Sequence, residues 1–135
     1  MLELEKIVQT YYDALEEGKV LARRCTKCGH IEYPPYLACN DCGNLDTEWC
    51  EVPENVMLTQ ILPVSAMFVT PDFKKNVGDY FICSVQPENG FEVGSCLLNV
   101  KPEQFAEIEA KIPCKVKPII VQEDGYKNVH WELAE

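Results

Sequence analysis

The sequence CTKCGHIEYPPYLACNDCG, residues 25–43, decides the fold of the first part of the chain. It holds two Cys-x2-Cys pairs, Cys25 with Cys28 and Cys39 with Cys42, separated by ten residues, and a glycine follows each pair directly. Two thiolates at this spacing can face one cation when the backbone forms a tight knuckle, and glycine suits the positive φ of such a turn. Two knuckles provide four soft ligands in a tetrahedron, a donor set that selects zinc, or less often iron.

The four cysteines predict a structural metal site, because four protein ligands leave no open position for water or substrate. The alternatives are two disulfides or four unrelated thiols; a redox pair is disfavoured because a second matching pair lies so near. His30 follows the first knuckle, but with four cysteines available we interpret it as a surface residue. The other cysteines lie in apolar, strand-like segments and are predicted to be small buried hydrophobes: Cys50, Cys83, Cys96 and Cys114.

Composition and charge indicate which classes of protein this chain can belong to. The 135 residues are 47% hydrophobic and 25% charged, as in ordinary globular domains, and the net charge is −10. The acidic balance disfavours nucleic acid as a partner, because that affinity comes largely from Lys and Arg on phosphates. No apolar run approaches the roughly 20 residues of a membrane span. The N-terminus lacks the basic and apolar segments of a signal peptide, so we expect a reducing cytoplasm and free thiols.

Three parts are predicted along the chain. Residues 1–18 read as an amphipathic helix that ends at Gly18, with apolar residues at three- and four-residue steps: Leu4, Ile7, Val8, Tyr11, Tyr12 and Leu15. Its apolar side packs either on this protein's own ribbon or on another chain. Residues 19–46 are the zinc ribbon, a segment so short that it needs the metal as a staple.

Residues 47–135 read as strands separated by turns. Strands are predicted over 47–52, 56–64, 80–86, 91–99, 114–122 and 126–133, and a short helix over 101–111. Five long strands with a helix between the third and the fourth favour a small closed barrel of the OB type; a sandwich is the alternative. The predicted fold class is therefore mostly β with an N-terminal α-helix: a rubredoxin-like zinc ribbon followed by a five-stranded OB-fold barrel.

The residues predict no catalytic group. The chain has only two histidines, and His130 beside Trp131 reads as a packed or strand-edge residue. Residues 65–79 read as a long apolar loop that carries Lys74 and Lys75, the only adjacent basic pair in the barrel half. This pair could meet a phosphate-bearing ligand; the alternative is a solvated pair on a loop.

The order of these features resembles a known family. A helix ending in Tyr11-Tyr12-Asp-Ala-Leu-Glu-Glu-Gly18, a ribbon with Tyr33-Pro34-Pro35 between its knuckles, and a strand with Trp49 lead into the barrel. In this it is similar to the small zinc-ribbon/OB-fold proteins encoded beside thiolases, over nearly the whole chain. Two elements differ, and their contacts are not carried over. Tyr36 stands where such proteins often have arginine, and Pro53-Glu-Asn-Val56 where they often have Gly-x-Gly-x-Val.

The resemblance implies a non-catalytic subunit of an acyl-CoA enzyme, most often a thiolase and sometimes a hydratase or dehydrogenase, in a degradative, β-oxidation-like pathway. The partner would supply the catalytic residues of this hetero-oligomer, and the small subunit would complete or cover the acyl-CoA site. The small subunit of benzoylsuccinyl-CoA thiolase is one candidate, which nothing in the sequence singles out. Lys74 and Lys75 are the candidate contacts to CoA phosphates. The alternatives are a single-stranded nucleic-acid-binding protein and a stand-alone acyl-CoA-binding protein.

Overall fold

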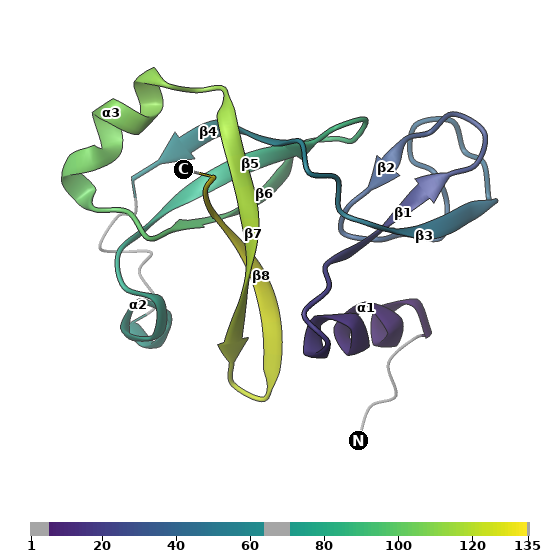
Figure 1. The fold of residues 1–135 in the computed structure, drawn as a ribbon, viewed down its shortest axis with the longest axis horizontal. Coiled ribbons are helices and arrows are strands. Elements are labelled where there is room, and N and C mark those ends of the chain that lie inside the picture. Colours follow the sequence, from purple (N-terminus) through teal and green to yellow (C-terminus); the bar gives the residue numbers. More distant parts are fainter. Residues whose placement is uncertain (1–5, 64–70, 135) are drawn as a thin grey trace. The chain divides into compact units, whose positions relative to one another are not determined.

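A computed structural model describes residues 6–63 and 71–134 (Figure 1). The elements follow in the order α1 (Lys6–Glu16), β1 (Leu21–Cys25), β2 (Ile31–Glu32), β3 (Thr47–Glu51), β4 (Val56–Leu62), α2 (Pro71–Val77), β5 (Tyr80–Pro87), β6 (Val93–Leu98), a 3-10 turn (Pro102–Gln104), α3 (Phe105–Ala110), β7 (Cys114–Glu123) and β8 (Tyr126–Leu133). The fold is mostly β with an N-terminal helix, as predicted. Among the described helices, none is long and apolar enough to cross a membrane.

The chain forms two compact units, which are described separately. The first comprises the chain up to Glu54 together with Pro87–Phe91 and Ile120–Asn128. The second comprises Asn55–Gln86, Glu92–Ile119 and Val129–Glu135. The hairpin ends between β5 and β6 and between β7 and β8 are therefore grouped with the first unit, although their strands belong to the barrel.

The first unit is built on a three-stranded antiparallel sheet in the order β2-β1-β3. Arg23 of β1 lies opposite Glu32 of β2 on one side and opposite Trp49 of β3 on the other. The sequence analysis predicts that residues 47–52 form the start of the barrel half. In the structure, Thr47–Glu51 pairs along its whole length with β1, so the ribbon sheet extends past residue 46.

Helix α1 packs within the first unit. Its buried residues are Ala14 and Leu15, and the Tyr11 hydroxyl is hydrogen-bonded to the Tyr33 hydroxyl of the ribbon at 2.9 Å. The rings of Tyr12 and Tyr126 meet edge to face with centroids 6.4 Å apart. The sequence analysis considered two surfaces for this helix, the chain's own ribbon and another chain. The hydrogen bond between Tyr11 and Tyr33 shows that the helix contacts the ribbon.

The second unit contains the closed barrel β4-β5-β6-β8-β7, which confirms the predicted five strands (Figure 1). Helix α3 follows the third barrel strand, β6, and precedes the fourth, β7, also as predicted. Alternate residues of the strands point inward. The centre of the barrel is filled by side chains that are almost completely buried: Val56, Leu58, Val85, Leu97, Val116 and Trp131.

The segment predicted as a loop over 65–79 is partly helical. Residues 64–70, which include Met67, Phe68 and Val69, lie outside the described part of the chain. Residues Pro71–Val77 form helix α2, and the Phe73 ring packs on Tyr80 and His130, with centroids 4.9 and 5.0 Å apart. Proline followed by an acidic residue is typical of the first turn of a helix. The sequence analysis did not use this signal, because it interpreted the segment from its apolar residues. His130 is 7% exposed, so its prediction as a packed residue is confirmed.

Candidate metal centre

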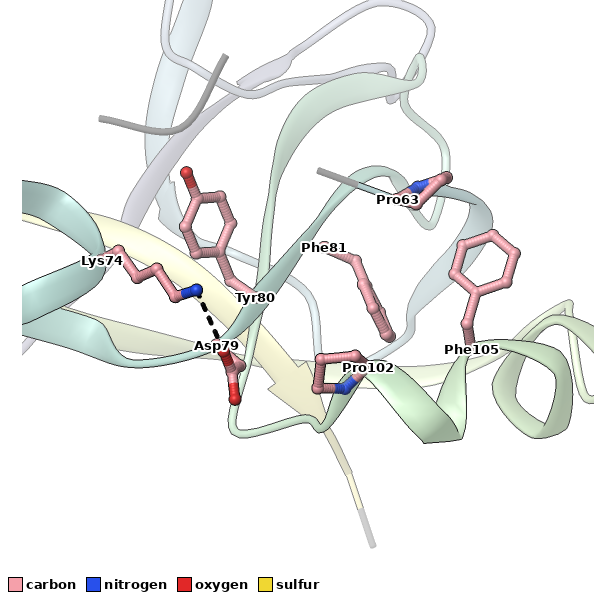
Figure 2. Close-up of a pocket in the computed structure, with 7 residues that line it drawn as sticks. All are labelled: Pro63, Lys74, Asp79, Tyr80, Phe81, Pro102 and Phe105. Atoms are coloured by element: carbon pink, nitrogen blue, oxygen red, sulfur yellow. Dashed lines mark ion pairs between the residues drawn. The ribbon is translucent and has the colours of Figure 1, made fainter. Parts of the chain in front are cut away.

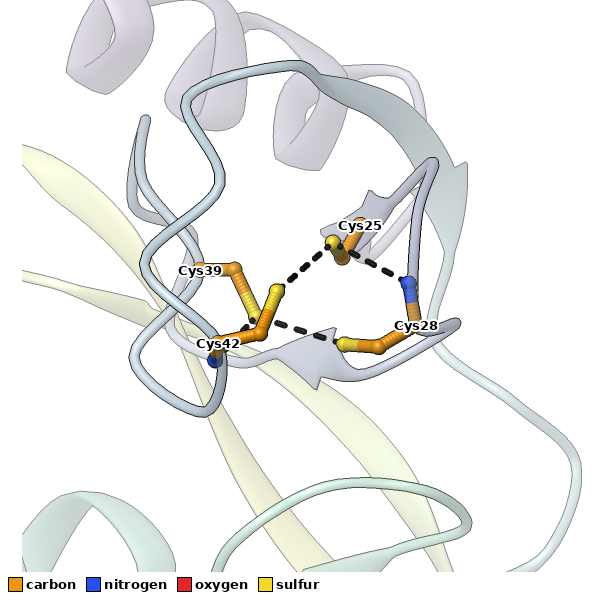
Figure 3. Close-up of side chains that lie close together, drawn as sticks. All are labelled: Cys25, Cys28, Cys39 and Cys42. Carbon is orange, nitrogen blue, oxygen red and sulfur yellow. Dashed lines mark hydrogen bonds between the residues drawn. The ribbon is translucent and has the colours of Figure 1, made fainter.

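The four predicted ligands meet at one point of the ribbon, Cys25 at the end of β1 and the others in the connections around β2 (Figure 3). All four Sγ atoms lie within 4.8 Å of one another, and the Cys25–Cys42 and Cys28–Cys39 pairs are 3.6 Å apart. A disulfide would require about 2.05 Å. Sulfurs placed about 2.3 Å from a zinc ion in a tetrahedron are about 3.8 Å apart. The donor set and its spacing therefore fit a four-coordinate zinc site.

The two knuckles have the backbone that their glycines predict. Gly29 and Gly43 have φ of 79° and 78°. The Gly29 amide donates to the Cys25 carbonyl at 3.1 Å, and the Gly43 amide donates to the Cys39 carbonyl at 2.9 Å. Each turn brings its two sulfurs to the same side, and a residue with a Cβ would be strained at either glycine.

Hydrogen bonds prepare the sulfurs for a cation. The amides of Lys27 and Cys28 donate to Cys25 Sγ at 3.4 and 3.5 Å, and Asn44 Nδ2 donates to the same sulfur at 3.5 Å. These bonds, the one from Cys28 foremost, lower the pKa of Cys25 to about 6. The His30 amide acts in the same direction on Cys28, yet burial and the neighbouring thiols raise the pKa of Cys28 to about 12. A bound cation would offset the repulsion between four thiolates held this close together.

One carboxylate, which the sequence analysis missed, ties the two knuckles together. Glu32 is only 5% exposed; its Oε1 accepts from the Asn40 amide at 2.7 Å and its Oε2 from Asn40 Nδ2 at 3.0 Å. The same Oε1 lies 3.1 Å from Nε2 of His30. Glu32 thus joins the residue that follows the first knuckle to the residue inside the second. The sequence does contain one indication of this role, because Glu32 is a charged residue between the apolar residues Ile31 and Tyr33.

The interpretation of His30 as a surface residue was wrong. Its side chain is buried, at 6% exposure, between Glu32 and the ring of Phe91, whose centroid is 4.4 Å from that of the imidazole. Four sulfurs already close the site, so the place of His30 is beside the metal centre and not in its ligand set.

The remaining cysteines are free thiols that differ in burial. Cys83 is buried, as predicted, and burial raises its pKa to about 12. Cys50, Cys96 and Cys114 are half-buried, so they are less enclosed than predicted. Burial also raises the pKa of Cys50 and Cys114. A thiol with a raised pKa is a poor nucleophile at neutral pH.

The two lysines of α2 have different surroundings. Lys74 lines a pocket of about 150 Å³ in the second unit, and its Nζ lies 3.6 Å from Asp79 Oδ1 (Figure 2). The rest of the lining is mostly aromatic or proline: Pro63, Tyr80, Phe81, Pro102 and Phe105. Lys75 is exposed and is not part of this lining. The structure thus places one member of the pair at a cavity.

Comparison with known proteins agrees with this architecture. Residues 13–48 match the family described as "ChsH2, rubredoxin-like zinc ribbon domain". The whole chain is similar in fold to a chain of the solved structure titled "Ltp2-ChsH2(DUF35) aldolase", with a TM-score of 0.63, 16% identity and 100% of both chains covered. No curated protein sequence matches the chain.

A second solved structure, a DUF35-family protein of unknown function from Sulfolobus solfataricus, matches with a TM-score of 0.57 and 15% identity. The match covers 95% of this chain and 85% of that one. At these identities the two structures establish the fold, and the family match establishes the ribbon. Residues 13–48 are therefore similar to the ChsH2 rubredoxin-like zinc ribbon, and the chain, which continues into a five-stranded closed barrel, is similar in fold to these two structures.

Proposed function

We propose that this protein is a non-catalytic subunit of an acyl-CoA enzyme complex, and that Cys25, Cys28, Cys39 and Cys42 bind one structural zinc ion in it. The observation that carries the proposal is the fold match over the entire chain to a chain of a structure whose title joins ChsH2 to Ltp2 as an aldolase. The resemblance in the sequence independently implies an acyl-CoA enzyme of the thiolase kind. The partner we propose is therefore a thiolase-like catalytic subunit in a degradative pathway.

The surroundings of the two histidines support a role without chemistry of its own. His30 is enclosed by Glu32 and Phe91, and His130 lies against Phe73, so both rings serve packing. A metal held by four sulfurs has no open coordination position. The zinc would fix the ribbon as a rigid surface, and the reaction would take place on residues of the partner.

The pocket at Lys74 supports a shared CoA site. Its volume of about 150 Å³ is below the roughly 300 Å³ at which pockets hold a drug-sized ligand. It could accommodate a fragment of CoA, with Lys74 and Lys75 near the phosphates, while the partner encloses the remainder. None of the eight cysteines, all of which lie in the described part of the chain, forms a disulfide, which fits a reducing cytoplasm as the place of action.

Isolation from the native host tests the proposal. The tagged chain is purified at moderate salt, the co-purifying proteins are identified by mass spectrometry, and zinc is measured in the same sample. We expect an acyl-CoA enzyme in a fixed ratio and one zinc per chain. Recovery of the chain with nucleic acid, or without any acyl-CoA enzyme, contradicts the proposal. Calorimetry with CoA on the isolated chain separates it from a stand-alone carrier, which alone would bind CoA tightly.

A further inference from the structure

A groove runs between helix α1 and the ribbon sheet inside the first unit. Its volume is about 300 Å³, twice that of the pocket at Lys74. Three of its lining residues come from the helix and three from the ribbon: Lys6, Ile7, Thr10, Arg23, Leu37 and Trp49. The metal centre does not use these side chains, so the groove is separate from the site described above.

Arg23 is held in one orientation at this groove. Its Nε and Nη2 donate to Thr47 Oγ1 at 3.2 and 2.9 Å, and Nη2 also donates to the Thr47 carbonyl at 2.6 Å. The guanidinium carbon lies 4.8 Å from the ring centroid of Trp49. A guanidinium fixed by hydrogen bonds and stacking has already lost its rotamer freedom, so a further partner costs it little entropy.

The two cations at the groove have no counter-charge among the described residues. The chain carries 22 acidic side chains, yet none of the described ones pairs with Arg23 or Lys6. The adjacent Arg24, by contrast, pairs with Glu48. The cross-strand neighbour of Arg23, Glu32, is engaged by Asn40. An arginine that is held in place but has no carboxylate partner in residues 6–63 and 71–134 is a distinct feature in a protein of net charge −10.

The groove also offers apolar surface. Leu37 is 62% exposed, the adjacent Tyr36 is 61% exposed, and Trp49 is half-buried. Arginine, tryptophan and tyrosine are the residues that most often carry the binding energy of protein interfaces. An apolar floor beside two cations that pair with no acidic residue of the described chain is complementary to an apolar side chain that stands next to a carboxylate.

We propose that the groove lined by Arg23, Lys6 and Trp49 is where the catalytic subunit docks, by inserting an apolar side chain flanked by an Asp or Glu whose carboxylate pairs with Arg23. This inference rests on the proposed function for the existence of that partner. Charge complementarity favours this occupant over a two-fold symmetric dimer, because a second copy would bring its own Arg23 and Lys6 to the same place.

The proposal is tested by comparing a substitution inside the groove with the same substitution at the adjacent residue outside it. The partner identified from the host is purified, and its Kd for immobilised wild type, Arg23→Gln and Arg24→Gln is measured. We expect Arg23→Gln to raise Kd by about 30-fold or more, because a buried charge pair loses one partner, and Arg24→Gln by less than about threefold. Equal zinc content and melting temperature establish that each variant is folded.

A second pair of variants tests the same groove if Arg23→Gln does not fold. Leu37→Glu places a carboxylate at the exposed lip of the groove, whereas Leu45→Glu makes the same change at a residue that is 81% exposed and outside the lining. We expect Leu37→Glu to weaken binding at least tenfold and Leu45→Glu to leave it unchanged.

The outcomes separate this inference from the proposed function. If an acyl-CoA enzyme is captured and binds the groove variants as well as their controls, the docking site is wrong and the proposed function stands. If the host yields no such enzyme, both are wrong. If the isolated chain self-associates and Arg23→Gln abolishes this, the groove belongs to a second copy, which overturns the inference.

Discussion

Replacing Glu32 with glutamine is expected to weaken the metal centre without touching a ligand. The wild-type carboxylate accepts one hydrogen bond from the Asn40 amide and another from the Asn40 side chain, at 2.7 and 3.0 Å, in a nearly closed environment. Glutamine retains one oxygen for the Asn40 amide, and the Asn40 side chain must turn its own oxygen toward the glutamine NH2 group, so both hydrogen bonds become bonds between neutral groups. The second knuckle loses part of its connection to the first.

The size of the effect follows from these contacts. A hydrogen bond to a charged group contributes about 1.5–3 kcal/mol, and a neutral one about 1 kcal/mol. Glutamine also removes the cost of burying a charge, which offsets part of the loss. We therefore expect a net loss of about 1–2 kcal/mol, equivalent to a roughly 5- to 30-fold lower zinc affinity, which overlaps the lower part of the roughly 10- to 100-fold range known for partners of metal ligands.

The assay is competition for zinc against a chromophoric chelator, with thermal unfolding measured in parallel. Glu48→Gln is the matched control, because Glu48 lies in the same ribbon sheet with its side chain 48% exposed. An exposed ion pair contributes at most about 1 kcal/mol, so this control is expected to stay near wild type. If Glu32→Gln holds zinc as tightly as Glu48→Gln, the reasoning about the carboxylate is refuted.

Three other changes are expected to have measurable results. Cys39→Ser, or excess chelator, removes the staple from the ribbon and unfolds residues 21–51, which far-ultraviolet circular dichroism detects; an unchanged spectrum contradicts a structural metal. Combined Lys74→Gln and Lys75→Gln raise the KM of the complex for its acyl-CoA about tenfold, as the loss of two phosphate contacts requires, whereas an unchanged KM removes both from the CoA site. Burial raises the pKa of Cys83 from 9.0 to about 12, so its contribution to stability is complete below pH 9 and is lost as the pH rises through 12. Cys83 is expected to resist iodoacetamide in the folded protein at pH 8 and to react after denaturation; rapid reaction in the folded state contradicts its burial.

The metal centre could be predicted from the sequence because its information is local. Ligand type, two-residue spacing and the following glycines all lie within residues 25–43, and the structure brings the four sulfurs together as expected. The barrel could be predicted for a similar reason, since strand alternation and hairpin turns are short-range patterns. The partition into residues 1–18, 19–46 and 47–135 stays a prediction, except that residues 47–51 pair with the ribbon strand β1.

What the sequence did not reveal depends on contacts between distant residues. Strand β3 was placed with the barrel because alternation identifies a strand but not its partner, and only the pairing of Arg23 with Trp49 assigns it to the ribbon. Glu32 reads as an ordinary surface charge until the fold brings Asn40 to it. The groove at Arg23 combines residues from one helix, two strands and the connection between β2 and β3, so no short stretch of sequence contains it.

The most direct test of the central claim is the rate of thioester turnover by the isolated chain, by the purified partner, and by the two mixed in equal amounts, with the partner's own acyl-CoA substrate. A zinc-stapled subunit without chemistry of its own predicts no turnover above background for the chain alone and a faster rate for the mixture than for the partner alone. Turnover by the isolated chain, or a partner whose rate and KM do not change when the chain is added, would contradict it.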